Sequence, residues 1–152
     1  MFSPVAGHVL AVSDIPDPVF AKGLVGPGRA IAPLPGRQVA VAPMAGTLVK
    51  LHPHAFVVHD RALGKAVLVH LGVDTVHMQG EGFELLVGEG VHVEPGDAIV
   101  SWDPAVVEAA GHSPICAVVV LDCDPDTVLK HRVDLDVAKE DLLLEVVDQP
   151  AG

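Results

Sequence analysis

The sequence is poor in aromatic side chains, and tyrosine is absent. Aromatic residues make up 3% of its 152 residues, so a hydrophobic core has to be built mainly from Val, Leu, Ala and Ile. No apolar run reaches the roughly 18 residues that a membrane-spanning helix needs. The first residues lack a basic region followed by an apolar one, which argues against a secretory signal. We therefore expect a soluble, cytoplasmic protein.

Basic residues and cysteines are also scarce. Nine Lys and Arg face 20 Asp and Glu, which gives a formal net charge of −11. Such a surface repels phosphate backbones, so we expect no nucleic acid partner and no membrane insertion. It attracts a basic protein, which is therefore the better candidate for a partner. The spacing of Cys116 and Cys123 fits neither a zinc knuckle nor a redox CxxC pair. Both are therefore predicted to be free thiols.

Glycine and proline, in contrast, are frequent. The 15 glycines and 13 prolines cluster in turn-like segments between short runs of Val, Ile and Leu. This pattern predicts an all-β fold, an antiparallel β-sandwich or barrel with short helical turns. We expect one domain over residues 1–152. A helix is predicted over 104–111, with Asp103 as its N-cap and Gly111 at its end, and a further helical turn over 124–131.

Two segments of the sequence resemble each other. VAPMAGTLVKL occupies residues 41–51, and VHVEPGDAIVSW occupies residues 91–102. Together they also resemble the biotinyl and lipoyl carrier domains. The Lys that is modified in those domains is missing from its context here. The likeness therefore predicts a duplicated, hybrid-motif architecture and no swinging-arm function.

Nine histidines are the unusual feature of the chain, and the segment VLVHLGVDT places one of them in an apolar strand. Side chains alternate along a strand, so Val67, Val69 and Leu71 form the better core face. His70 then shares the opposite face with Leu68. A histidine in such a position is more often held by a backbone carbonyl than used in chemistry, so the neighbouring segments have to decide its role.

The preceding segment, LHPHAFVVH, brings a second histidine close. The residues HDRALGK are typical of a hairpin that turns near residues 61–64. A hairpin centred on residue 62 pairs His54 directly with His70, with Cβ atoms about 4.5–5.5 Å apart. The sequence therefore predicts two adjacent imidazoles.

Two adjacent imidazoles suit two kinds of chemistry. They bind zinc, or one attacks phosphorus while the other donates a hydrogen bond to the phosphoryl oxygens. In both cases the second ring nitrogen needs a carbonyl or a carboxylate that fixes the tautomer. Asp74 is near in sequence, and it reaches the ring only if the chain turns back after Gly72.

With these segments the chain resembles the glucose-type enzyme IIA family of the bacterial sugar phosphotransferase system. The likeness covers roughly residues 3–146. It rests on SPVAGHVLAVSDIPDPVFAKGLVGPGRAI, VAPMAGTLVKLHPHAF, VLVHLGVDTVHMQGEGFELLVGEGVHVEPGD and SPICAVVVLD. The resemblance implies an antiparallel β-sandwich, a phosphotransferase activity and no required cofactor.

The resemblance also implies roles for individual residues. His70 matches the histidine that accepts a phosphoryl group from the phosphohistidine of the carrier protein HPr and passes it to a cysteine on the IIB domain of a sugar permease. His54 matches the second active-site histidine, which donates a hydrogen bond to the phosphoryl group. Asp74 matches an Asp that contacts or shapes the site. His52 stands where relatives commonly carry a Thr that helps the relay, so the relay is expected to differ in detail here.

Phosphoryl transfer between proteins needs an exposed apolar patch around the histidines. The positions that match the docking surface for HPr and the IIB domain are Val19, Phe20, Leu24, Val25, Phe56, Leu68, Val76 and Met78. Family members often control other proteins according to their phosphorylation state. Regulated proteins are therefore a third class of expected partner.

A zinc-dependent hydrolase is the alternative function, with His52, His54 and His70 as its cluster. In that interpretation zinc binds at His54 and His70, and a third ligand and a catalytic water complete the site. The sequence offers no motif for the third ligand. It leaves zinc binding, the sugar, the permease and the oligomeric state open.

Overall fold

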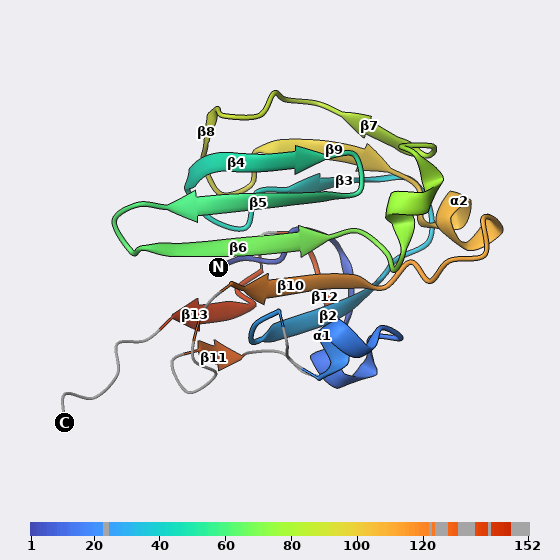
Figure 1. The fold of residues 1–152 in the computed structure, drawn as a ribbon, viewed down its shortest axis with the longest axis horizontal. Helices are drawn as coiled ribbons and strands as arrows, with labels where there is room; N and C mark the ends of the chain where they lie inside the picture. The colour runs from blue at the N-terminus through green and yellow to red at the C-terminus, as the bar shows by residue number, and fades with distance from the viewer. Residues whose placement is uncertain (23–24, 122, 124–127, 131–135, 140, 147–152) are drawn as a thin grey trace.

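Short strands dominate the protein, as the spacing of its turn residues predicts. The structure is a computed structural model, and it describes all residues except 23–24, 122, 124–127, 131–135, 140 and 147–152 (Figure 1). In chain order the described elements are β1 (Gly7–Ala11), η1 (Val12–Asp14), α1 (Pro18–Ala21), β2 (Gly28–Pro33), β3 (Gln38–Val41), β4 (Gly46–His52), β5 (Ala55–Asp60), β6 (Lys65–His70), η2 (Thr75–Met78), β7 (Phe83–Leu85), β8 (His92–Val93), β9 (Ala98–Trp102), α2 (Pro104–Ala109), β10 (Cys116–Val120), β11 (Val128–Lys130), β12 (Asp136–Val137) and β13 (Leu144–Val146).

The strands form an antiparallel β-sandwich, which confirms the predicted fold class. Among the described residues, eight strands make one sheet in the order β12–β1–β2–β10–β6–β5–β4–β8, and a second sheet has the order β3–β9–β7. β11 and β13 pair separately. Phe56 and Leu48 from the large sheet and Trp102 and Ile99 from the small one are completely buried in a common core.

The two similar segments of the sequence lie side by side. β3 pairs with β9 and β4 pairs with β8, both in antiparallel orientation. The two strand pairs follow one continuous register, because Val41 pairs with Ala98 and Gly46, five residues later, pairs with Val93, five residues earlier. This pairing of like segments agrees with the duplicated architecture that the sequence predicts.

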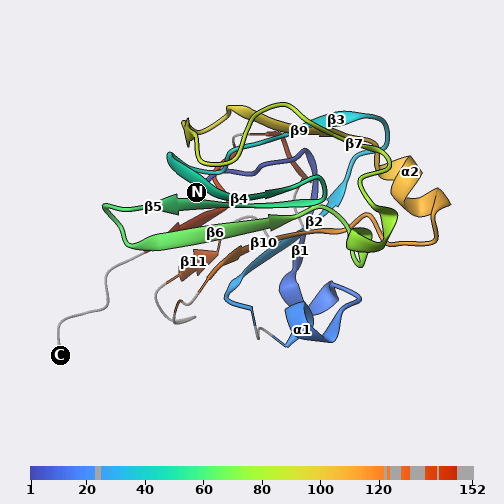
Figure 2. The ribbon, with the colours of Figure 1, turned by 45° about the horizontal axis from the view of Figure 1, so that its top comes forward.

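Strand β6 presents the core face that the sequence predicts. Val67, Val69 and Leu71 are completely buried, whereas Leu68 and His70 on the opposite face are half-buried. Figures 1 and 2 place α1 and α2 at the end of the molecule where β4 and β6 finish. The functional histidines predicted from the sequence lie at this end.

The β5–β6 hairpin has a register one residue away from the predicted one. Its loop spans residues 61–64, and Ala55, not His54, pairs with His70. A loop with an even number of residues makes the sum of paired residue numbers odd, and this excludes a pair of 54 with 70. His54 lies instead in the two-residue turn that joins β4 to β5.

The helix predicted over 104–111 is present as α2. The Asp103 carboxylate caps it by accepting a hydrogen bond from the Ala105 N–H at 2.9 Å. Gly111 follows the helix with a φ of +87°, a left-handed conformation that glycine adopts without strain. Both of the predicted end signals are therefore confirmed.

The helical turn predicted over 124–131 is wrong for Val128–Lys130, which form β11 and pair with β13. Tertiary strand pairing overrides the weak local preference for helix there. Residues 124–127 and 131 lie outside the described part of the chain. Within the described part, no helix is long and apolar enough to cross a membrane.

Candidate functional site

His70 is the last residue of β6, and the turn that follows holds its ring. Nδ1 lies 2.6 Å from the carbonyl oxygen of Gly72. A carbonyl only accepts hydrogen bonds, so Nδ1 carries the hydrogen of the neutral ring and Nε2 keeps its lone pair. The turn therefore selects the tautomer in which Nε2 can act as a nucleophile.

The turn after β6 requires glycine at position 72. Its φ of +82° is left-handed, and an added Cβ would approach the Thr75 side chain to 2.6 Å and the Ser113 carbonyl oxygen to 3.0 Å. The Thr75 hydroxyl donates to the Leu71 carbonyl at 2.8 Å. The Val73 N–H donates to the Ser113 carbonyl at 2.9 Å. The carbonyl that orients the imidazole thus belongs to a tightly held turn.

His54 approaches His70 from the β4–β5 turn. The two ring centroids are 5.3 Å apart in an edge-to-face arrangement. The Leu71 N–H donates to the His54 carbonyl at 2.8 Å, which ties this turn to the end of β6. His52, the last residue of β4, stacks on His54 with a centroid distance of 5.7 Å and an interplanar angle of 20°. The predicted contact of His54 with His70 is confirmed, although the predicted register is wrong.

Burial lowers the pKa of both inner histidines. The pKa of His54 falls to about 4, because burial penalises its charged form and because His70 and His52 repel a second positive charge. Burial also lowers the pKa of His70, against the opposing effects of the Gly72 hydrogen bond and two nearby carboxylates. Both rings are therefore neutral near pH 7, as a nucleophile and a neutral hydrogen-bond donor require.

A short helix that the sequence analysis missed, α1, packs against His70. Phe20 is only 9% exposed, and its ring lies 5.6 Å from the His70 ring, edge to face. Asp17 caps the helix by accepting a hydrogen bond from the Val19 N–H at 2.9 Å, with Pro18 at the first position. Its charge also raises the pKa of His70. The Asp-Pro pair in SDIPDPVF is the local signal for this helix and its acidic cap.

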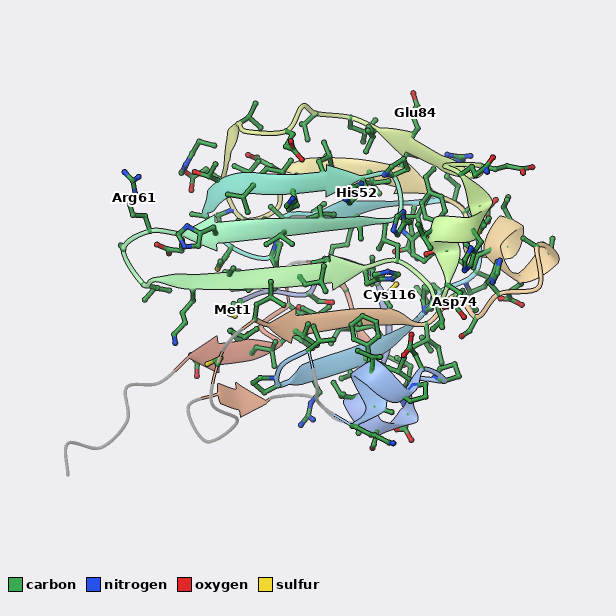
Figure 3. All side chains as sticks on the ribbon, in the orientation of Figure 1. Met1, His52, Arg61, Asp74, Glu84 and Cys116 are labelled. Atoms are coloured by element: carbon green, nitrogen blue, oxygen red, sulfur yellow. The ribbon has the colours of Figure 1, made fainter. Side chains whose placement is uncertain are left out.

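Asp74 influences the site through its charge. It is exposed and has a φ of +58°, which Asp tolerates better than most residues. Its carboxylate raises the pKa of His70. The sequence left open whether Asp74 bonds the second ring nitrogen of His70. The Gly72 carbonyl makes that bond instead and so fixes the tautomer. In Figure 3, Arg61 lies at the far left of the molecule, away from Asp74 and His52.

Comparison with known proteins assigns this chain to a family. Residues 1–125 match the family described as phosphoenolpyruvate-dependent sugar phosphotransferase system, EIIA 1. The chain belongs to this EIIA family. A glucose-specific EIIA component from Halalkalibacterium halodurans is 39% identical over 133 residues, which cover 87% of this chain and 76% of the relative. The resemblance drawn from the sequence is confirmed.

The EIIA fold recurs in a solved structure and in larger chains. Glucose permease IIA from Mycoplasma capricolum matches with a TM-score of 0.82 and 27% identity, over 94% of this chain and 92% of that chain. The glucose-specific EIIBCA component of Corynebacterium glutamicum is 38% identical over 118 residues, 78% of this chain and 17% of that protein. Family membership gives this EIIA chain a role in phosphoryl transfer.

The docking positions predicted for this EIIA chain differ in exposure. Two of them present apolar surface at the end where His70 lies: Val19 is 49% exposed and Val76 is 55% exposed. Val25 and Leu68 are half-buried. These four residues define what we call the docking face.

Three of the other predicted docking residues are buried. Phe56 is 0% exposed and Met78 is 8% exposed, and both belong to the core. The prediction that these two lie on a docking surface is wrong, because they point into the sandwich. Phe20 is buried against His70, so it packs on the His70 ring and adds little to the surface. Leu24 lies outside the described residues.

The three-histidine cluster gives no support to the zinc hydrolase alternative. In the ranges that the structure describes, no group of three or more His, Cys, Asp or Glu side chains is arranged to hold a metal ion. Instead, His54 contacts His52 on one side and His70 on the other, and Nδ1 of His70 is bonded to Gly72. The family match also indicates phosphoryl transfer and not hydrolysis.

Cys116 lies in β10, the strand that pairs with β6 beside His70. It is a buried free thiol, as predicted. Burial raises the pKa of this thiol to about 12. A thiol that stays protonated is a poor nucleophile, so Cys116 contributes packing to the site and not chemistry.

Proposed function

We propose that this EIIA domain is a phosphocarrier, in which His70 accepts a phosphoryl group from phosphorylated HPr and passes it to a cysteine of a permease IIB domain. The observation that carries the proposal is the 2.6 Å hydrogen bond between His70 Nδ1 and the Gly72 carbonyl. That bond leaves the lone pair on Nε2. The neighbouring His54 ring, 5.3 Å away, supplies a hydrogen-bond donor.

In the accepting step, Nε2 of neutral His70 attacks the phosphorus atom. A nitrogen–phosphorus bond forms, and the bond between phosphorus and the histidine nitrogen of HPr breaks. The electron pair of the broken bond returns to the HPr ring, and the His70 proton stays on Nδ1. Because no proton has to leave the site, transfer requires only that docking puts donor, phosphorus and acceptor in line.

In the releasing step, the cysteine thiolate of the IIB domain attacks the phosphorus. A sulfur–phosphorus bond forms, the nitrogen–phosphorus bond breaks, and the electron pair returns to Nε2 of His70. His54 donates a hydrogen bond to the phosphoryl oxygens in both directions. A pKa of about 4 keeps His54 neutral at physiological pH, so the phosphoryl group is oriented without a full ion pair that would trap it.

The docking face suits both protein partners. Val19 and Val76 offer exposed apolar contacts, and the carboxylates of Asp17 and Asp74 act on the same end of the molecule. This acidic border would attract a basic rim on HPr and speed the encounter. Relatives named EIIBCA and EIICBA, in which the EIIA sequence is part of a permease chain, support a IIB partner.

Phosphorylation would also change what the docking face binds. A phosphoryl group adds a charge of about −1.5 to −2 at neutral pH. An apolar partner surface fits the uncharged face. After phosphorylation, its binding would strip water from the charged phosphoryl group, and this desolvation costs free energy. Regulated proteins that bind this face would therefore distinguish the two states.

The test is incubation with phosphorylated HPr, followed by intact-mass measurement and site mapping under alkaline conditions, where phosphohistidine survives. We expect one acid-labile phosphoryl group on His70 in the wild type and none in His70→Gln. His92→Gln, which changes an exposed histidine elsewhere on the large sheet, is the matched control and should be phosphorylated normally. A folded wild-type protein that gains no phosphoryl group, or a His70→Gln variant that still gains one, would contradict the proposal.

A further inference from the structure

His52 is placed where it can govern the charge of His54. It is exposed at the end of β4 (Figure 3), whereas His54 is half-buried. The His52 ring stacks on His54 at 5.7 Å, and His54 in turn contacts His70 at 5.3 Å. The three rings form a series that leads from solvent to the nucleophile, and we call it the imidazole series.

A stacked pair of imidazoles holds one positive charge better than two. One cationic ring is attracted to the π face of a neutral ring, whereas two cationic rings repel each other. The charge costs least on the ring that keeps the most water, which is His52. A positive charge on the stacked His52 ring disfavours a second one on His54, and this repulsion is one of the causes that lower the pKa of His54.

Phosphorylation is the event that brings such a proton. The phosphoryl group is an anion near neutral pH, so it increases the proton affinity of nearby bases. A proton on His54 would make a direct ion pair with the phosphoryl group on His70 and would slow its release. A proton on His52 compensates the same charge from one ring further away, so the phosphoryl group remains transferable.

Three carboxylates lie around the imidazole series. Asp17 from the cap of α1 and Asp74 from the turn before η2 favour a positive charge on His70. Glu89, from the loop before β8, lies beside the end of β4, where its carboxylate accepts a hydrogen bond from the Leu51 N–H at 2.9 Å. Glu89 therefore places negative charge near the end of β4 that carries His52.

We propose that His52 is a positioning residue that holds the compensating proton of the site, so that His54 stays neutral while phosphoryl groups arrive on His70 and leave it. This inference rests on the proposed phosphocarrier function. A residue that cannot be protonated at position 52 would leave His54 as the next base in the series. Transfer to the IIB domain would then weaken as the pH falls.

The first part of the test uses the unphosphorylated protein and needs no partner. The ring resonances of His54 are followed by NMR as a function of pH in wild type, His52→Gln and His92→Gln. Gln keeps a planar polar side chain but cannot take up a proton. The pKa of His54 should rise in His52→Gln by at least about 0.3 pH unit, a twofold change in the ratio of cationic to neutral ring. It should stay unchanged in His92→Gln.

The second part uses the phosphorylated protein. In the wild type, the proton taken up as the pH falls from 8 to 6 should reside on His52. Transfer to the IIB domain by His52→Gln should match the wild type at pH 8 and fall at least about twofold below it at pH 6, which corresponds to a His54 ring that the added phosphoryl charge makes at least half cationic at that pH. His52→Thr repeats the measurement with a smaller side chain if the Gln variant is poorly folded.

Two outcomes would overturn the inference. One is a His54 titration that neither His52→Gln nor His52→Thr moves in the free protein. The other is a phosphorylated wild type that carries the proton on His54. If HPr transfers no phosphoryl group to the wild type, the phosphocarrier function fails, whereas the titration of the free protein still decides whether His52 keeps His54 neutral.

Discussion

The two ends of strands β4 and β5 carry histidines in opposite settings. At one end, His52, His54 and His70 contact one another, and burial and like charge take the pKa of His54 to about 4. At the other end, His59 and His92 line an open depression of about 230 Å³. We call these the ring end and the open end.

The open end surrounds its side chains with water and carboxylates. His92 Nε2 lies 2.8 Å from the Glu94 carboxylate, and both side chains are 64% exposed. The Asp60 carboxylate accepts hydrogen bonds from the N–H groups of Ala62 and Leu63, so it holds the hairpin loop. A carboxylate can orient an imidazole as a carbonyl does, so the two ends differ mainly in burial: His92 is exposed, whereas His70 is half-buried beside a second imidazole. The comparison teaches that a histidine becomes a candidate nucleophile where burial keeps it neutral and a carbonyl selects its tautomer.

The largest expected difference between the two ends is in phosphoryl transfer. His54→Ala should lower net transfer from phospho-HPr to the IIB domain by about 10²–10³-fold, the usual effect of removing one hydrogen-bond donor from a transition state. His70 should still be phosphorylated in this variant, because the nucleophile is intact. His92→Gln should change transfer little. Steady-state transfer assays on both variants check this, and equal effects at the two ends would break the comparison.

Glycines at the two ends of β6 sharpen the comparison. Gly72 and Gly64 both have positive φ, +82° and +62°, but an added Cβ meets Thr75 at 2.6 Å only at Gly72 and meets nothing within 4 Å at Gly64. Gly64→Ala should cost about 1 kcal/mol of unfolding free energy from backbone strain alone. Gly72→Ala should cost about 3 kcal/mol, because a steric clash is added.

Gly72→Ala should also slow phosphorylation of His70, because the displaced carbonyl no longer selects its tautomer. Urea denaturation gives the two stabilities, and the phosphorylation assay gives the two rates. Gly64→Ala serves as the control for strain without displacement of the site. Equal losses of stability, or a phosphorylation rate unaffected in Gly72→Ala, would contradict the role assigned to the turn.

The last expected effect is a pH dependence of stability that arises at the ring end. The folded pKa of His54 is about 4, below the ordinary value of about 6.5 in an unfolded chain. Between these values the unfolded chain binds the proton and the folded chain does not, so the free energy of unfolding falls as the pH is lowered from 6.5 to 4. His54→Gln should make this fall shallower. Urea titrations at several pH values measure the slope, and an unchanged slope would count against the lowered pKa.

Much of the fold could be predicted from local patterns in the sequence. The burial of Val67, Val69 and Leu71 follows from a period of two along one strand, and the Asp103 cap follows from a short-range signal. The register of the β5–β6 hairpin could not be predicted reliably, because a single residue in the loop decides it. Phe56 and Met78 looked like docking residues by resemblance, and only their orientation in the sandwich shows that they are core.

By itself, the sequence determined the β-sandwich, the family and the pairing of His54 with His70 as neighbours, because these depend on periodicity, turn residues and motifs that are local in the chain. The tertiary structure alone decided which nitrogen of His70 keeps its lone pair, through the carbonyl of Gly72. It also decided that His54 is neutral and that His52 stacks on it. Protonation and tautomer depend on burial and on distances between rings in space, and these exist only once the strands have paired.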